Sequence, residues 1–242
     1  MSGKRAFFGR EETMKIGGLE KVSLIDYPGE ICAVVFTQGC NFRCPYCHNP
    51  ELVDPERYGP CLAEKEIIRF LSSRRGKLDA VTITGGEPTL QKDLPYFVGK
   101  IRKMGFAVKL DTNGSLPEVV GRLLGEKLID YIAMDVKAPL EKYEAVTGVP
   151  QAAQAVRESI RLILRSDISH EFRLTLVPGL VGPDDVPAVA REIAGARRFA
   201  LQKFRGAKTL NRIYLDKETY PDEVFLKIKE ALEKDIPAVI VR

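Results

Sequence analysis

Short apolar runs alternate along the chain with stretches whose apolar residues recur every three or four positions. The runs are rich in β-branched residues and have the length of buried strands, whereas the spaced stretches are typical of helices that cover a sheet. We predict six core strands, at residues 31–37, 80–84, 107–110, 131–136, 171–177 and 198–202. Predicted helices lie at residues 62–75, 94–104, 119–124, 152–165, 185–193 and 222–234, and a candidate last strand at 238–241.

This alternation predicts an α/β fold with a parallel sheet and outer helices. Eight such units close a barrel, so six predict an open, partial (β/α)6 barrel. In parallel sheets the chemistry gathers at the carboxyl ends of the strands. The unusual residues of the chain fit this rule, because each is expected directly after a strand: Cys40, Gly85, Asp111, Lys137, Pro178 and Gln202.

Composition narrows the class of protein. Of the 242 residues, 45% are hydrophobic and 29% charged, which excludes a mostly disordered chain. The longest stretches without a charged residue have 12 residues, at 31–42 and 145–156, whereas a membrane span needs about 18. No signal peptide is recognisable, so the expected location is cytoplasmic. Residues 1–13 are expected to be a disordered extension of a single domain at 14–242, and a net charge of +4 does not indicate nucleic acid.

Three of the five cysteines, Cys40, Cys44 and Cys47, follow the first predicted strand with the spacing Cys-x3-Cys-x2-Cys. Three thiolates on one loop can hold three irons of a [4Fe–4S] cluster and leave the fourth iron open. A Cys₃His zinc site that includes His48 is an alternative. The sequence from Cys44 to His48 also matches the c-type haem pattern, although that chemistry needs export. Cys32 and Cys61 are expected to be packed or surface thiols.

The cysteine loop, with Tyr46 before its last cysteine, resembles that of the radical S-adenosylmethionine superfamily. The segment from Gly85 to Pro88 (GGEP) is similar to the superfamily's glycine-rich motif, although alone it is equally typical of a plain turn. Each motif follows its own strand in the order that the superfamily shows. The resemblance implies a [4Fe–4S] cluster and S-adenosyl-L-methionine as cofactors. It implies that Tyr46 lies beside the adenine and that the glycine backbone meets the methionine amino group.

From about Gly18 onward, the chain resembles the activating enzymes of glycyl-radical enzymes, above all in residues 23–29 and 38–50. The nearest pattern is that of the long-form activating proteins of anaerobic ribonucleoside-triphosphate reductase, with pyruvate formate-lyase activating enzyme as a relative. The resemblance implies a glycyl-radical enzyme as protein substrate and a flavodoxin- or ferredoxin-like electron donor. It implies reductive cleavage of S-adenosylmethionine and abstraction of a glycine Cα hydrogen. Neither a membrane nor a nucleic acid is an expected partner.

The resemblance also assigns individual residues. Lys137 pairs with the methionine carboxylate, and Asp135 holds that lysine or a cation. Asp111 takes the methionine amino group. Catalysis falls to Cys40, Cys44, Cys47 and Lys137, the cysteines being the metal ligands, and cofactor binding to Tyr46, Asn49, Gly85, Gly86, Glu87, Asp111, Thr112, Asn113, Asp135, Lys137, Val177 and Gln202.

Several of these assignments have a simpler alternative. Residues 111–114 (DTNG) are typical of an Asx turn at the end of a strand, and Asp135 with Lys137 is typical of an ion pair. Val177 fits a core position as well as an adenine contact. Gln202 stands where the formate-lyase activases have a histidine, which weakens that specific assignment.

Two other function classes stay open: a radical enzyme for a small molecule, similar to 7-carboxy-7-deazaguanine synthase, and a zinc-binding module without enzymatic activity. The basic stretch from Arg197 to Arg212 is either a docking site for an acidic partner or an ordinary solvated face.

Overall fold

The computed structural model describes residues 14–242, in which eight strands form one sheet in chain order from β1 to β8. The first pair is antiparallel and every later pair is parallel. The strands are β1 (Ile16–Ser23), β2 (Cys32–Thr37), β3 (Ala80–Gly85), β4 (Ala107–Thr112), β5 (Tyr131–Asp135), β6 (Ser169–Leu176), β7 (Phe199–Lys203) and β8 (Val239–Val241).

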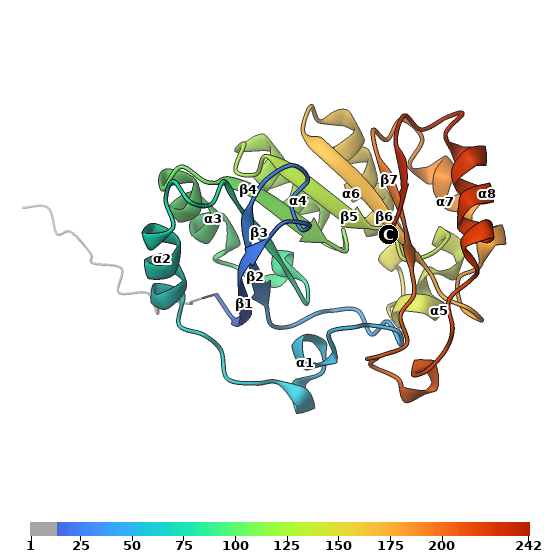
Figure 1. Cartoon of the computed structure of the whole chain (residues 1–242), viewed down its shortest axis with the longest axis horizontal. Helices are drawn as coiled ribbons and strands as arrows, with labels where there is room; N and C mark the ends of the chain where they lie inside the picture. Colours follow the sequence, from blue (N-terminus) through green and yellow to red (C-terminus); the bar gives the residue numbers. More distant parts are fainter. Residues whose placement is uncertain (1–13) are drawn as a thin grey trace, which may run out of the picture.

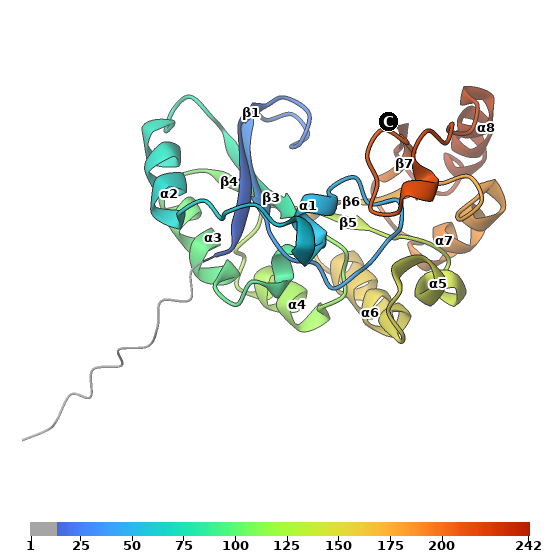
Figure 2. The same ribbon diagram turned by 90° about the horizontal axis from the view of Figure 1, so that it is seen from below.

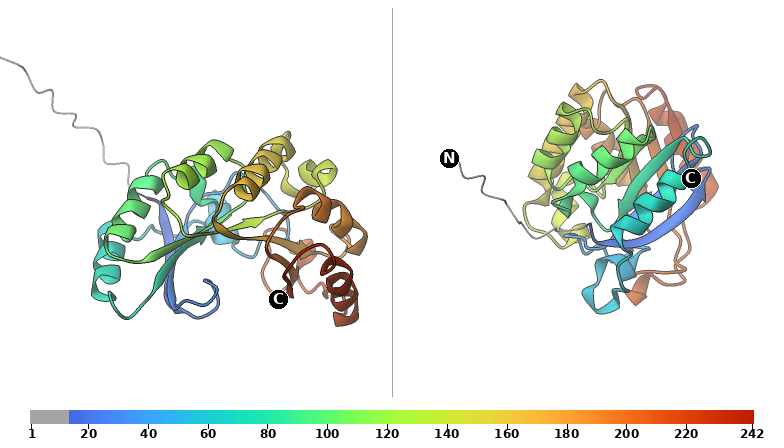
Figure 3. Two further views of the ribbon diagram at one scale, coloured as in Figure 1. Left: turned by 90° about the horizontal axis from the view of Figure 1, so that it is seen from above. Right: turned by 90° about the vertical axis from the view of Figure 1, so that its left-hand side faces the viewer.

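The helices are α1 (Pro50–Val53), α2 (Glu64–Ser73), α3 (Leu94–Lys103), α4 (Pro117–Gly125), α5 (Tyr143–Thr147), α6 (Ala152–Arg165), α7 (Val186–Glu192) and α8 (Asp222–Leu232). All except the short α1 lie on the convex side of the arched sheet (Figure 3). The main hydrophobic core fills the space between these helices and the sheet. No helix within residues 14–242 is long and apolar enough to cross a membrane.

The sheet does not close, because β1 and β8 are both edge strands (Figures 1 and 2). Its concave face is therefore accessible along the side where these two strands lie apart. A small second core, formed by Tyr27, Cys32, Val34, Ala80, Tyr131 and Ala133, covers part of this face. The predicted open barrel with outer helices is thus confirmed.

The two-residue period of a strand decides which side chains reach the concave face. In β5, Ile132 and Met134 belong to the core under the helices, while Tyr131 and Ala133 belong to the concave cluster. Asp135 follows in the same alternation. The same period brings the polar residues of β4 and β6 onto the concave face.

The structure departs from the predicted elements in three ways. β1 was not predicted, because its two glycines and the charged Glu20 and Lys21 hide the strand pattern. α1 and α5 are too short to show a helical period. Gly85, Asp111 and Gln202 lie within the last two residues of β3, β4 and β7 and do not follow these strands. The extension predicted for residues 1–13 lies outside the described residues.

Candidate active site

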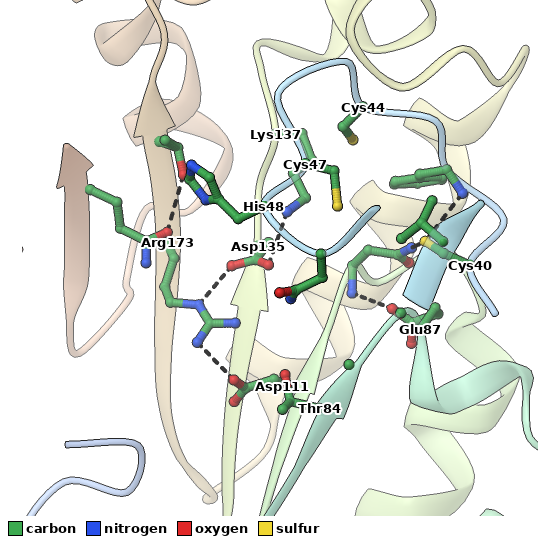
Figure 4. A pocket seen from close by; sticks show the side chains of 18 of the residues that line it. Cys40, Cys44, Cys47, His48, Thr84, Glu87, Asp111, Asp135, Lys137 and Arg173 are labelled. Atoms are coloured by element: carbon green, nitrogen blue, oxygen red, sulfur yellow. Dashed lines mark hydrogen bonds and ion pairs between the residues drawn. The ribbon is translucent and has the colours of Figure 1, made fainter. Parts of the chain in front are cut away.

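A cavity of about 560 Å³ opens on the concave face at the carboxyl ends of the parallel strands (Figure 4). It is lined by the loop of residues 38–49, which we call the cysteine loop, and by the ends of β3 to β7. Parts of the β1–β2 turn and Arg242, which follows β8, complete the lining. All predicted site residues except Val177 line it: Cys40, Cys44, Tyr46, Cys47, Asn49, Gly85, Gly86, Glu87, Asp111, Thr112, Asn113, Asp135, Lys137 and Gln202. Val177 is buried elsewhere, in a bridge to Val181.

The three clustered cysteines share one wall of the cavity. Burial raises the pKa of the Cys44 thiol to about 11 and that of the Cys40 thiol to about 12. Iron binding therefore has to displace protons from these thiols. Within residues 14–242, no three His, Cys, Asp or Glu side chains converge as the ligands of one ion do. In a [4Fe–4S] cluster each thiolate binds a different iron, so the three sulfurs need not converge on one point.

The segment after β7 fastens the cysteine loop from the C-terminal side. The His48 Nε2 lies 2.8 Å from the Arg205 carbonyl oxygen, and the His48 ring stacks on Phe204. The Asn211 N–H donates to the Pro45 carbonyl at 2.8 Å. His48 thus shapes the loop as well as lining the cavity. In the basic stretch, Lys203 pairs with Asp222 and Lys208 with Glu51.

Gly85 and Gly86 are required by the packing of the chain against itself. A Cβ on Gly86 would stand 2.0 Å from the Gly39 carbonyl oxygen, and one on Gly85 would stand 2.3 Å from the Thr37 nitrogen. Gly85 also has a φ of +118°, which disfavours other residues. The expected reason for these glycines was the approach of a ligand. The structure adds a reason of its own, since β3 must end against β2 and the cysteine loop.

Glu87 ties the turn after β3 to the turn after β4. It is fully buried, and its carboxylate accepts hydrogen bonds from the Thr112 hydroxyl and the Asn113 N–H, both at 2.7 Å. Thr89 donates its main-chain N–H and its hydroxyl to the same carboxylate. Burial raises the pKa of Glu87 in spite of these bonds. Glu87 therefore orders its own turn and also the next one.

On the opposite side of the cavity, five charged side chains form a chain of ion pairs, which we call the ion ladder. Arg173 joins two carboxylates, with Nη1 2.9 Å from Asp111 Oδ2 and Nε 2.6 Å from Asp135 Oδ1. Lys109 pairs with the free side of Asp111, and Lys137 lies 2.9 Å from Asp135 Oδ2. Three cations thus face two carboxylates, and the ladder carries an excess positive charge.

The charges within the ion ladder determine the protonation states of Asp135 and Lys137. Burial alone would raise the pKa of Asp135, but the Arg173 and Lys137 cations hold it well below its usual range. Burial alone would lower the pKa of Lys137, but Asp135 raises it well above the ordinary value. Lys137 therefore stays an ammonium group at the edge of the cavity, where it can bind an anion.

Sequence reasoning gave Arg173 no role, although it lies at the centre of the ladder. One signal existed: Glu171, Arg173 and Thr175 are polar at every second position of residues 171–176, which are otherwise apolar. Glu171 is buried and pairs through both oxygens with Arg242, at 3.1 Å each. The Thr175 hydroxyl donates to Gln202 Oε1 at 3.2 Å, so Gln202 lies beside another polar cavity residue.

Residues 34–193 match the model of the radical SAM superfamily. A Methanocaldococcus jannaschii protein, whose name provisionally describes it as a glycyl-radical enzyme activating enzyme, is 34% identical over 91% of this chain and 88% of its own. The pyruvate formate-lyase-activating enzyme of Clostridium pasteurianum is 32% identical over 69% of this chain and 70% of its own. A solved structure of TYW1 with a lysine–pyruvate adduct superposes with a TM-score of 0.62 at 18% identity, covering 85% of this chain and 74% of that one.

The chain belongs to the radical SAM superfamily. It is a radical SAM enzyme, and its cofactors are a [4Fe–4S] cluster and S-adenosylmethionine.

The residues of the cavity fit these cofactors. Three thiols from one loop meet the cavity, and the ion ladder offers an excess positive charge for a carboxylate. The Tyr46 hydroxyl is buried beside the cavity and has no hydrogen-bond partner among the described residues. A buried hydroxyl without a partner is costly, which is expected where a ligand completes the site.

Proposed function

We propose that this enzyme activates a glycyl-radical enzyme by removing a hydrogen atom from the Cα of one glycine of that partner. The observation that carries the proposal is the extent of the similarity, which spans most of this chain and most of two relatives named as activating enzymes. The resemblance of residues 23–29 and 38–50 supports anaerobic ribonucleoside-triphosphate reductase as the partner. A flavodoxin- or ferredoxin-like protein is the proposed electron donor.

The open side of the sheet supports a protein substrate. The cavity is lined on one edge by Ile25 and Asp26 of the β1–β2 turn and on the other by Arg242 after β8. Leu24 and Ile25 are 72% and 82% exposed. Apolar side chains this exposed at the mouth of a site are typical of a surface that another protein covers. A loop carrying the reactive glycine could enter between these two edges.

A [4Fe–4S] cluster bound here would, once reduced by the electron donor, supply the one electron needed to cleave S-adenosylmethionine into methionine and a 5′-deoxyadenosyl radical. The residues of this chain hold and orient the reactants. Cys40, Cys44 and Cys47 would each bind one iron. Lys137, kept cationic by Asp135, would bind the methionine carboxylate. The buried walls of the cavity would keep water from the radical.

The adenosine and amino ends of S-adenosylmethionine would meet the rest of the cavity. Tyr46 would lie beside the adenine, and Asn49 and Gln202 line the same space. The methionine amino group would approach the backbone of the turn after β3. Both oxygens of Asp111 already pair with Lys109 and Arg173, so a third cation would share this carboxylate with them.

The proposal is tested under anaerobic conditions with the reconstituted chain, dithionite, S-adenosylmethionine and purified anaerobic ribonucleoside-triphosphate reductase. We expect 5′-deoxyadenosine together with the electron paramagnetic resonance signal of a glycyl radical on the reductase. Cys44→Ala should abolish both, because one iron loses its ligand.

Three other results would decide against parts of this proposal. A glycyl radical on pyruvate formate-lyase but not on the reductase would replace the partner. Turnover of a small molecule without any protein partner would favour the deazaguanine-type alternative. A chain that holds zinc and forms no 5′-deoxyadenosine would overturn the mechanism itself.

The role of the β1–β2 turn has its own test. Ile25→Ser should raise the KM for the protein partner about 10- to 150-fold, because burial of one such side chain contributes about 1.5–3 kcal/mol. Cleavage of S-adenosylmethionine without the partner should not change. The matched control is Leu226→Ser, which alters a residue 60% exposed on α8, away from the cavity. Equal effects of both substitutions would show that the turn has no special role.

A further inference from the structure

Lys137 is held at two points, through its side chain and through its main chain. Its Nζ pairs with Asp135, and its main-chain N–H donates to the Tyr143 hydroxyl at 2.9 Å. The ion pair restrains the end of a flexible side chain, whereas the main-chain bond fixes the position from which that side chain starts. Tyr143 therefore restrains the base of the ammonium group that reaches into the cavity.

Tyr143 is the first residue of α5, and its side chain is packed on all sides. It is 1% exposed, and its ring meets the Phe42 ring edge-on, with the ring centroids 6.3 Å apart. Phe42 lies in the cysteine loop between Cys40 and Cys44. One side chain thus contacts the main chain of Lys137 through its hydroxyl and the cysteine loop through its ring.

The other end of α5 contacts the cysteine loop a second time. The Thr147 carbonyl accepts a hydrogen bond from the Arg43 main-chain N–H at 2.7 Å. The buried Thr147 hydroxyl donates to the Tyr143 carbonyl, also at 2.7 Å, which locks the two ends of the helix together. α5 therefore links Lys137 to Phe42 and Arg43 of the cysteine loop, which are more than ninety residues away in sequence.

We propose that Tyr143 is a positioning residue, which through α5 sets the separation between Lys137 and the cysteine loop. It would thereby set where the methionine carboxylate is held relative to the cluster, so the proposal rests on the role of Lys137 given above. The proposal depends on the Tyr143 hydroxyl, because it is this group that accepts the hydrogen bond from the Lys137 N–H. Phenylalanine would fill the same core, and a buried hydroxyl stabilises a protein only where it is hydrogen-bonded.

The test is Tyr143→Phe in the full chain with its cluster reconstituted. Loss of the bond leaves the Lys137 N–H without its acceptor, and we expect the Kd for S-adenosylmethionine to rise about 5- to 30-fold. The KM for S-adenosylmethionine should rise in parallel, while kcat at saturation stays within about twofold. The resonance signal of the reduced cluster should match wild type without S-adenosylmethionine and differ once it is added.

Two variants separate this proposal from simpler explanations. Tyr131→Phe is the matched control, since it removes another buried hydroxyl, 3.5 Å from Glu171 and on the same strand that leads to Lys137. It should leave the Kd unchanged. Lys137→Ala tests the role on which the proposal rests, and it should weaken binding at least as much as Tyr143→Phe.

Two results would overturn the proposal in different ways. If Lys137→Ala weakens binding while Tyr143→Phe binds S-adenosylmethionine as wild type does, Tyr143 is only a core residue. If Lys137→Ala also binds as wild type does, the assignment of the carboxylate to Lys137 is wrong, and Tyr143 has nothing to position.

Discussion

The two sides of the cavity stabilise a carboxylate in opposite ways. On the β3 side, Glu87 is fully buried and surrounded by neutral hydrogen-bond donors, and burial raises its pKa. On the β5 side, Asp135 lies between two cations, which hold its pKa down against the effect of burial. One carboxylate is thus stabilised by dipoles and the other by charges.

The difference corresponds to what each side has to do. Glu87 joins two turns, and neutral donors suffice to fix backbone positions. The ion ladder has to keep an ammonium group charged in a buried site, which requires a permanent counter-charge close by. On the Glu87 side, neutral hydrogen-bond donors fix the positions of two turns, and we call this the frame side. On the other side, the charges of the ion ladder keep Lys137 ready to bind an anionic group.

The largest effect is expected from removing the cation at the centre of the ladder. Arg173→Met leaves Asp111 and Asp135 each with one lysine and without the shared guanidinium. Because each carboxylate loses a charge-assisted hydrogen bond to the guanidinium, worth about 1.5–3 kcal/mol, we expect the free energy of unfolding to fall by about 3–5 kcal/mol. Urea denaturation of the cluster-free chain measures it.

Arg173→Lys is the control for this prediction. Lysine keeps the charge but cannot bridge two carboxylates with a rigid fork, so its loss of stability should be intermediate. A loss below about 1 kcal/mol in Arg173→Met, the size typical of an exposed ion pair, would show that the ladder behaves like a surface pair.

A smaller effect is expected on the other side of the cavity. Glu87→Gln keeps an oxygen for Thr89 and Thr112 but turns an NH₂ group toward the Asn113 N–H. Loss of that hydrogen bond should lower the free energy of unfolding by about 1–3 kcal/mol. Glu230→Gln, at an exposed position of α8, is the control and should change it by less than about 0.5 kcal/mol. Equal losses in the two variants would show that the ties made by Glu87 do not matter.

The frame side was the easier one to predict from sequence. The cysteine spacing and the glycine-rich turn are local patterns, and each follows a strand whose apolar run is plain. The six core strands and the side on which chemistry gathers follow from such patterns alone. Even here the packing reason for Gly85 and Gly86 was hidden, because it depends on backbone atoms of another strand.

The charged side depends on strand register, which the sequence does not state. Asp135 and Arg173 are direct partners in the β5–β6 pairing, although 38 residues separate them. Polar residues at alternate positions of β6 indicate an exposed face as readily as a buried ladder. α5 was missed for a different reason, since its five residues, which are followed by Gly148, are too few to show a helical period.

The smallest and most discriminating difference between the two sides is in their pH dependence. The pKa of Glu87 is raised on folding, so its contribution to stability is fully present below the unfolded value of about 4.3 and declines as the pH rises above it. The pKa of Asp135 is lowered, so its contribution is present above about 3.9 and is lost as the pH falls below that value.

Two variants of the cluster-free chain isolate these contributions, because each removes one titrating group and leaves the other. Relative to wild type, the stability deficit of Glu87→Gln should grow as the pH falls from 7 to 4. The deficit of Asp135→Asn should shrink as the pH falls from 5 to 3. Urea denaturation across this range measures both. If the two deficits moved in the same direction with pH, the two carboxylates would share one kind of environment, and the distinction between a dipolar frame and a charged ladder would fail.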